Sequence, residues 1–265
     1  MINILKKAYV GIIIFIIYAP IALLMIFSFN NSKAKQWKGF TFKWYIDLLN
    51  DSSIQTAFYY TILIALISSL LATIIGTLAA IGIEKMKSLS KTIVMNLTYI
   101  PVLSPDIVIG ISMMLLFATI KIPLGITTLI LAHTTFCIPY VILSVMPKLK
   151  QLNYNIYEAA LDLGATPIYA FRKVIMPEIM PGIISGAFIA FTLSIDDFVV
   201  SFFNTGPGVS TLSIQIYSMA RRGVNPKINA LSTLMFVVIM LLLVMINIKA
   251  DRETKRNMKK EIINR

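Results

Sequence analysis

The sequence alternates between long apolar runs and shorter polar segments, and the apolar runs are long enough to cross a lipid bilayer. A helix needs roughly 20 predominantly apolar residues to span a hydrocarbon core of about 30 Å. Runs of this kind predict six transmembrane helices in an all-α, polytopic membrane protein: Ala8–Ser28, Ala57–Ile83, Ile93–Ile120, Leu124–Met146, Gly182–Phe203 and Ala230–Ile248.

These runs also indicate how the chain is organised. We expect an N-terminal helix and external loop over residues 1–56, a transmembrane domain over residues 57–248 and a basic cytoplasmic tail over residues 249–265. The first run exceeds the roughly 7–15 apolar residues of a signal peptide and lacks a small-x-small cleavage site, so it predicts an uncleaved helix. The second run carries small residues spaced for close helix contact: Ser69, Thr73, Gly76 and Ala80.

Lysine and arginine residues predict the orientation, because they concentrate in cytoplasmic loops. With the N-terminus inside, the cytoplasmic segments hold most of these residues, including those of the tail. Both termini are therefore expected in the cytoplasm. The net charge of +12 is then mainly a signal of topology, and no basic face with interleaved aromatic residues indicates nucleic-acid binding.

The composition supports a membrane protein and excludes several kinds of site. Hydrophobic residues make up 57% of the chain and charged residues 14%, whereas soluble domains carry about 25% charged residues. The single cysteine, Cys137, excludes a disulfide framework and a cysteine-based metal site. The single histidine, His133, excludes a histidine-cluster metal centre, and we expect it to form hydrogen bonds between helices.

An aromatic segment, Asn30–Thr56, lies between the first two runs on the expected outer side. Its aromatic residues stand among lysines and are Trp37, Phe40, Phe42, Trp44 and Tyr45. One interpretation is an interfacial aromatic belt with a short amphipathic helix on the membrane surface. The other is an external lip that meets a protein or a substrate.

A second polar segment, Pro147–Pro181, is predicted to form two short cytoplasmic helices. The first covers about Asn155–Leu163 and ends at Gly164, which suits a left-handed position after a helix. Thr166 can cap the second helix, with Pro167 at its first position. We expect that second helix to end at Pro177.

This segment carries a motif that resembles the "EAA" loop of ABC-importer permeases, and we call it the EAA loop. The family pattern is Glu-Ala-Ala, three free positions, Gly, nine free positions and Ile-x-Leu-Pro. Its counterparts here are Glu158, Ala159, Ala160, Gly164, Val174, Met176 and Pro177. The valine and the methionine replace isoleucine and leucine and preserve apolar character.

The resemblance implies a type I ABC importer permease, in which this loop docks a short helix into a cleft on a cytoplasmic ATPase. Carried over, Glu158, Ala159, Ala160 and Gly164 would form the docking elbow, and Pro177 would end the second loop helix. The implied partners are a second permease subunit, a cytoplasmic ATPase dimer and an extracytoplasmic binding protein at a bacterial inner membrane.

The division of labour among these partners agrees with the sequence. No GxxxxGK[ST] phosphate-binding loop occurs in the chain. We therefore expect ATP and magnesium to be bound by the separate ATPase. The chain itself is expected to bind no cofactor or metal and to be a transport subunit rather than an enzyme.

Three acidic residues lie inside the predicted spans: Asp106, Asp196 and Asp197. An ionised aspartate in the bilayer centre costs about 2.5–3.5 kcal/mol, so these residues should line a water-filled path or lie between helices. Neighbouring helical positions point about 100° apart. One acid of the pair is therefore expected to face the path while the other meets a neighbouring helix or a backbone N–H.

The predicted spans contain no lysine or arginine, so these acids create a negative region suited to a cation. Pro101 and Pro105 would interrupt the third span beside Asp106. The alternative is that the acids are protonated or only satisfy local hydrogen bonds.

Two further stretches, Pro101–Leu115 and Ser194–Arg222, resemble the permease subunits of spermidine/putrescine ABC importers. This resemblance implies a polyamine substrate that passes the three acids, with Trp44 and Tyr99 as aromatic contacts. Two alternatives stay open. One is a type I importer permease for another solute, such as iron or another cationic or small organic substrate. The other is a transporter or channel that works without ATP.

Overall fold

The computed structural model describes residues 2–32, 36–223, 226–241 and 244. Regular structure in these residues is helical, apart from an isolated β-bridge between Asn30 and Phe40. The chain forms two compact units, which are described separately: Met1–Thr56 with Gln215–Arg265, and Ala57–Ile214.

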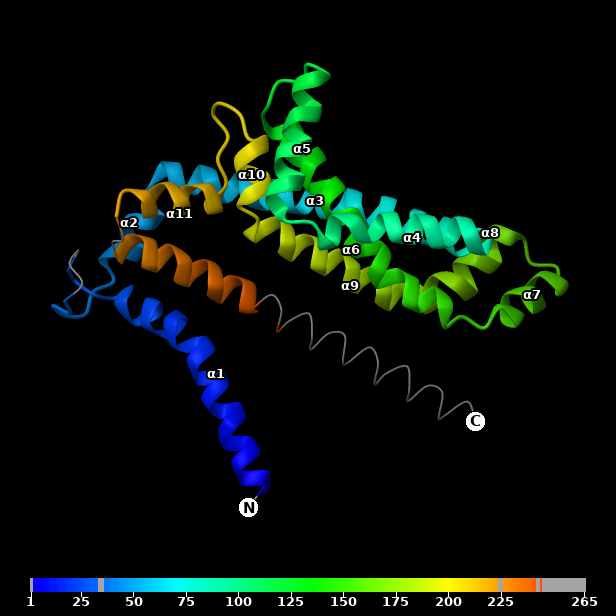
Figure 1. Cartoon of the computed structure of the whole chain (residues 1–265), viewed down its shortest axis with the longest axis horizontal. Coiled ribbons are helices and arrows are strands. Elements are labelled where there is room, and N and C mark those ends of the chain that lie inside the picture. The colour runs from blue at the N-terminus through cyan, green and yellow to red at the C-terminus, as the bar shows by residue number, and fades with distance from the viewer. Residues whose placement is uncertain (1, 33–35, 224–225, 242–243, 245–265) are drawn as a thin grey trace. The chain divides into compact units, whose positions relative to one another are not determined.

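The helices follow the chain in the order shown in Figure 1. They are α1 (Ile2–Phe27), α2 (Lys43–Leu49), α3 (Ser52–Glu84), α4 (Ser88–Leu103), α5 (Asp106–Thr119), α6 (Ile126–Lys150), α7 (Tyr154–Asp162), α8 (Pro167–Ala170), the π-helical turn η1 (Phe171–Ile175), α9 (Met176–Asp196), α10 (Val199–Asn204) and α11 (Leu212–Arg221). A further apolar helix covers Pro226–Leu241.

The predicted number of six spans is not confirmed within the described residues. There, four helices are long and apolar enough to cross a membrane: Lys6–Phe27, Ser52–Glu84, Ile126–Lys150 and Pro167–Asp196. Counting α4 and α5 as one bent span gives up to five. The sixth predicted span, Ala230–Ile248, extends beyond the described residues, and the tail 249–265 lies outside them.

The first unit holds the aromatic segment together through hydrogen bonds and stacked rings. The indole N–H of Trp44 donates to the carbonyl oxygen of Asn30 at 2.8 Å, and the rings of Phe29 and Phe40 stack at 5.0 Å. The predicted short helix of this segment is confirmed as α2. Lys227 donates to the carboxylate of Asp51, and this hydrogen bond holds the pKa of Asp51 below its usual value.

The third predicted span is not straight, because α4 and α5 meet at an angle of 105°. Ser104, which joins them, is extended, with φ −78° and ψ 144°. Pro105 follows, and a proline disfavours the helical conformation of the residue before it and supplies no N–H to the helix. The proline pair was expected to interrupt this span, but the sharp bend was not.

The fifth predicted span is also broken. Helix α9 ends at Asp196, Asp197 is extended with φ −60° and ψ 126°, and α10 begins at Val199. The assumption that both acids lie on one continuous helix is therefore wrong. They occupy the last position of one helix and the connection to the next.

The EAA loop confirms its local predictions except at Pro177. Helix α7 matches the first predicted loop helix, Gly164 has φ +86°, and Thr166 accepts a hydrogen bond from the N–H of Tyr169. The prediction that the second loop helix ends at Pro177 is wrong, because one helix runs from Pro167 to Asp196. Pro177 lies in the first turn of α9, directly after η1, and the wider π-helical turn accommodates a residue without an N–H.

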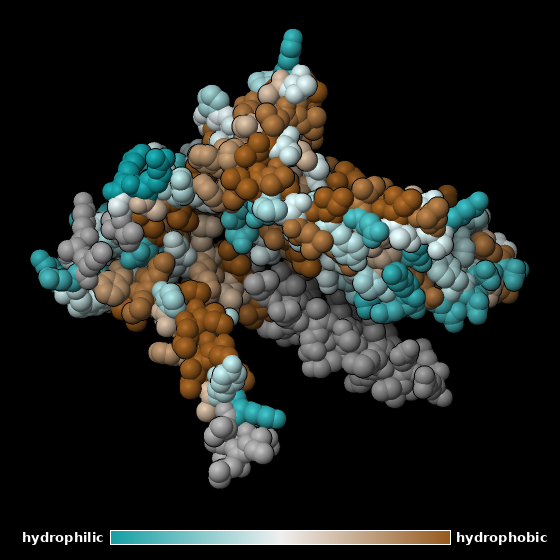
Figure 2. Space-filling model, viewed as in Figure 1, coloured by the Kyte–Doolittle hydropathy of each residue, from teal (hydrophilic) through white to brown (hydrophobic). Residues whose placement is uncertain are grey.

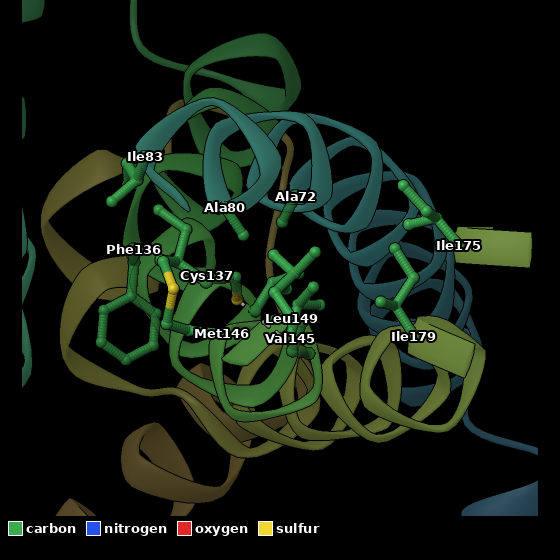
Figure 3. Packing of buried hydrophobic residues seen from close by; sticks show 13 residues of the cluster. Ala72, Ala80, Ile83, Phe136, Cys137, Val145, Met146, Leu149, Ile175 and Ile179 are labelled. Carbon is green, nitrogen blue, oxygen red and sulfur yellow. Dashed lines mark hydrogen bonds between the residues drawn. The ribbon is translucent and has the colours of Figure 1, made fainter. Parts of the chain in front are cut away.

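The core of the second unit lies where α3, α6 and α9 meet. Figure 3 shows side chains of the three segments pointing toward one another, with Ala72 and Ala80 from α3, Val145 and Leu149 from α6, and Ile179 from α9. Figure 2 shows apolar residues over the visible faces of α3 and α5, whereas hydrophilic residues gather over α7. This distribution suits helices in lipid and a loop in water.

Small residues let α9 approach α6 closely. Gly182, Gly186 and Ala190 recur every four residues and are all buried. A Cβ added to Gly182 would lie 2.8 Å from the carbonyl oxygen of Ser144. Gly76, one of the small residues noted in the second run, approaches Val141 of α6 in the same way. Close backbone packing of this kind drives helix association in membranes.

We expect Gly182→Ala to destabilise the protein although alanine is the better helix former. The added methyl group would press on the backbone of α6, and overpacking of this kind costs about 1–3 kcal/mol. Gly82→Ala is the matched control, because a Cβ at Gly82 meets no atom within 4 Å. Thermal unfolding in detergent should show a lower midpoint for Gly182→Ala alone. An unchanged midpoint would contradict the close approach of the two helices.

Candidate functional site

The structure gathers the three predicted acids at two helix breaks. Asp106 is the first residue of α5, directly after the bend, and Asp196 is the last residue of α9. Both are exposed within the unit. Asp106 and Asp197 each lie close enough to Asp196 to interact with it electrostatically. Two segments distant in sequence thus contribute negative charge to one region.

Asp197 has a different environment from its neighbour. One of its carboxylate oxygens accepts a hydrogen bond from the N–H of Val200 at 3.2 Å, and the other accepts from the N–H of Ser201 at 2.7 Å. Its side chain is only 6% exposed. Asp197 therefore caps the first turn of α10, where a negative charge also meets the positive end of the helix dipole. This confirms that one acid of the pair meets backbone N–H groups. That the exposed Asp196 faces a substrate path stays a prediction.

His133 forms the hydrogen bonds between helices that were expected of it. The ring is fully buried on α6. Its Nδ1 lies 2.7 Å from the hydroxyl of Ser194 in α9, and its Nε2 lies 3.0 Å from the hydroxyl of Ser201 in α10. The carboxylate of Asp197 is 3.6 Å from Nε2. One side chain thus contacts both helices that meet at the break.

Helix α10 also forms hydrogen bonds with α5 and with the start of α6. The side-chain amide of Asn204 donates to the carbonyl oxygen of Gly110 at 3.1 Å. Its backbone carbonyl accepts from the hydroxyl of Thr128 at 2.9 Å. A Cβ on Gly110 would lie 3.3 Å from the carbonyl oxygen of Val199, so the two helices touch. The elements that follow the two breaks therefore pack together.

The two predicted aromatic contacts, Tyr99 and Trp44, belong to different units and differ in exposure. Tyr99 lies on α4 and is 42% exposed. Trp44 is buried in the other unit, where its indole N–H is already hydrogen-bonded. For both residues a contact with substrate remains a prediction.

Sequence analysis missed Tyr140, which lies on α6 and interacts electrostatically with Asp106. Its ring meets that of Phe136 edge-on at 5.5 Å. Seven residues separate Tyr140 from His133, a spacing that places both on one side of a helix. That periodicity is the signal that could have identified it.

The EAA loop presents its motif at the surface, at an end of the second unit remote from α10 (Figure 1). Glu158, Ala159 and Gly164 are exposed, and Ala160 is half-buried. Nearby, Leu163 is 89% exposed and is a large apolar side chain. A single exposed leucine is common on protein surfaces, so contact of this loop with an ATPase stays a prediction.

A single helix joins this loop to Asp196. It runs for 30 residues from Pro167, just after the elbow, to Asp196. At 1.5 Å per residue it covers about 45 Å. A displacement of the loop would therefore be carried along a continuous helix to the acidic region.

Comparison with known proteins supports the same interpretation. Residues 72–251 match the family described as the binding-protein-dependent transport system inner membrane component. The spermidine/putrescine transport system permease protein PotC of Escherichia coli strain K12 is 38% identical over 256 residues, which cover 96% of this chain and 97% of that protein. The putrescine transport system permease protein PotI of the same strain is 41% identical over 227 residues, covering 82% and 80%.

Solved structures show the fold. A chain of a bacterial ABC transporter involved in the import of the acidic polysaccharide alginate aligns with a TM-score of 0.72 at 18% identity, covering 94% of this chain and 96% of that chain. A chain of the MetNI methionine ABC transporter in an inward-facing conformation aligns with a TM-score of 0.58 at 19% identity, covering 77% and 94%. Both alignments indicate the fold of ABC importer permeases. The chain belongs to the family of binding-protein-dependent transport system inner membrane components.

Proposed function

We propose that this chain is a permease subunit of an ATP-driven ABC importer for polyamines of the spermidine and putrescine class. It forms half of the transmembrane path, and a second permease subunit forms the other half. The observation that carries the proposal is the exposed pair Asp106 and Asp196, of which Asp196 ends the continuous helix that begins in the EAA loop. The similarity to PotC and PotI supports the choice of substrate.

The acidic region suits a substrate that carries several ammonium groups. Two unit charges 4 Å apart attract by about 1 kcal/mol in water and about 4 kcal/mol at an effective dielectric constant of 20. Asp106 and Asp196 offer two such attractions, and the half-buried Tyr140 of α6 interacts electrostatically with Asp106. An ammonium group is attracted by an aromatic face as well as by a carboxylate.

Transport in this proposal follows from two states of the whole assembly. An extracytoplasmic binding protein delivers the polyamine, and ATP with magnesium binds to the separate ATPase dimer. Closure of that dimer draws in the EAA loop, and α9 transmits the movement to the break at Asp197. ATP shifts the equilibrium because it binds one state more tightly. The permease carries out no covalent chemistry.

The proposal places the chain in a bacterial inner membrane with both termini in the cytoplasm. This orientation puts the EAA loop on the side where ATP is available. It also puts the aromatic segment of the first unit on the outer side. The excess of lysine and arginine on the cytoplasmic side supports this topology.

Uptake of labelled polyamines tests the proposal directly. The chain is expressed together with a second permease subunit, an ATPase and a binding protein from the same organism, in a bacterial strain that lacks polyamine uptake. We expect saturable uptake of spermidine or putrescine, and its loss when the phosphate-binding lysine of the ATPase is replaced. Uptake of iron or another solute instead of polyamines would overturn the substrate assignment. Full uptake with the inactive ATPase would overturn the ABC mechanism.

A further inference from the structure

His133 bridges the break between α9 and α10 from a third helix. Its two ring nitrogens contact Ser194, in the last turn of α9, and Ser201, in the first turn of α10. A neutral imidazole offers one donor and one acceptor, so both hydroxyl contacts can be hydrogen bonds at once. The rigid ring therefore fixes how far apart the ends of the two helices lie.

The residues enclosed by this bridge are those that shape the acidic region. Asp196 and Asp197 lie between Ser194 and Ser201 in the chain. Asp197 is held by the N–H groups of α10, and its carbonyl oxygen accepts a hydrogen bond from the hydroxyl of Ser213 at 2.6 Å. Asp196 is the exposed member of the pair, and its carboxylate accepts a hydrogen bond from its own backbone N–H. The direction in which its carboxylate points therefore depends on the geometry of the break.

The surroundings of His133 suit a residue that fixes the geometry of the α9–α10 break. The ring is fully buried. The carboxylate of Asp197, in the connection between α9 and α10, lies 3.6 Å from Nε2. Cys137, one helical turn further along α6, donates to the carbonyl oxygen of Ala190 in α9. Of these two buried residues, it is His133 whose hydrogen bonds reach both sides of the break.

We propose that His133 is a positioning residue for substrate passage, which holds the α9–α10 break in the geometry that presents Asp196 to the substrate. This inference rests on the proposed function, because it assigns a substrate-facing role to Asp196. His133 itself contacts no substrate in this proposal. It acts through the hydroxyl groups of Ser194 and Ser201 and through Asp197, which caps α10.

A double-mutant cycle between His133 and Asp196 tests the inference in the complete transporter. Initial rates of labelled spermidine uptake are compared for His133→Ala, Asp196→Asn and the double variant, at matched amounts of assembled complex. We expect each single variant to lower uptake roughly tenfold or more, since small misplacements of a binding group have effects of this size. The double variant should be no worse than Asp196→Asn, because both changes remove the same interaction.

Three further variants separate positioning from general packing. Cys137→Ala removes a buried polar group one turn away and should leave uptake unchanged. Ser201→Ala removes one arm of the bridge with little change in volume. It should show the same non-additivity with Asp196→Asn, which provides the test if His133→Ala does not assemble. His133→Gln, whose amide reaches toward the Nε2 position, should restore part of the uptake lost in His133→Ala.

The outcomes distinguish this inference from the proposed function. If the double variants lose uptake by the product of the two single effects, the positioning role of His133 is overturned and the acidic path stays intact. The positioning role is also overturned if His133→Ala and Ser201→Ala take up polyamine as fast as Cys137→Ala. Normal uptake by Asp196→Asn would overturn the acidic path, and the role of His133 with it.

Discussion

Replacing Gly164 by valine is expected to abolish transport while leaving the membrane helices folded. Gly164 has φ +86°, and a Cβ at this position would meet no atom within 4 Å. The substitution therefore adds backbone strain without a steric clash. A left-handed conformation costs an L-residue about 1–2 kcal/mol, and a β-branched side chain is an outlier there. The elbow should relax to another conformation and change the angle between α7 and α8.

The consequence should be loss of coupling to the ATPase. Helix α7 carries Glu158 and Ala159 on its exposed surface, and the helix from Pro167 to Asp196 begins directly after the elbow. A changed angle would misplace the proposed docking surface on α7 relative to that helix. Binding of the ATPase to the purified permeases and substrate-stimulated ATP hydrolysis are the measurements that report this change. Both should fall together with uptake.

Gly208→Val is the matched control for this prediction. Gly208 has φ +81°, and a Cβ there also meets no atom within 4 Å. The control therefore introduces the same kind of strain, in the turn after α10 rather than in the EAA loop. It should retain ATPase binding. If Gly164→Val retains both uptake and stimulated ATP hydrolysis, the elbow does not couple the two subunits.

The EAA loop could be predicted well because its signals are local. Gly164 ends α7 in the left-handed conformation, Thr166 caps α8, and Pro167 occupies the first position of that helix. Each of these preferences depends on a few neighbouring residues. Pro177 is the exception, because η1 allows the helix to continue through a proline. A π-helical turn has no comparable signature in the sequence.

The helix breaks could be predicted only in part, because their geometry depends on distant residues. Hydropathy identified the third and fifth runs as candidate spans, and the prolines indicated an interruption beside Asp106. The break at Asp197, however, is stabilised by His133, which lies 64 positions earlier in the numbered sequence. Gly182 and Gly186 likewise have meaning only against the backbone of α6. Such long-range contacts are invisible to a periodicity argument.

The residues of the candidate site also divide into those that a local sequence signal reveals and those that depend on distant contacts. The sequence identified all three acids, because an ionisable residue in an apolar run is conspicuous. It also predicted that the neighbouring acids would have different roles. Tyr140 was missed although it lies on the same side of α6 as His133. The hydrogen bond from Asn204 to the carbonyl oxygen of Gly110 could not be predicted, because it forms only when α5 and α10 pack together.

Asp196→Asn is expected to lower polyamine uptake roughly tenfold or more while leaving assembly with the ATPase intact. The change preserves the shape of the side chain and removes its charge. An attraction of about 1–4 kcal/mol between a carboxylate and an ammonium group 4 Å away would be lost, and each 1.4 kcal/mol corresponds to a factor of about ten. Asp196 is exposed and caps no helix in the described part of the chain, so folding should tolerate the change. Initial uptake rates and co-purification of the ATPase measure the two effects separately.

Glu178→Gln is the control for this last prediction, because it removes one negative charge from the opposite end of the same helix. Glu178 is exposed in the first turn of α9. If a general loss of negative charge were responsible, both variants would lower uptake alike. If the local field at the break is responsible, only Asp196→Asn lowers uptake, and Asp196→Glu retains much of the wild-type rate.

Asp106→Asn should then lower uptake as Asp196→Asn does, since both carboxylates act on the same region. Wild-type uptake by the Asp106→Asn, Asp196→Asn double variant would show that the polyamine passes through the membrane without these acids.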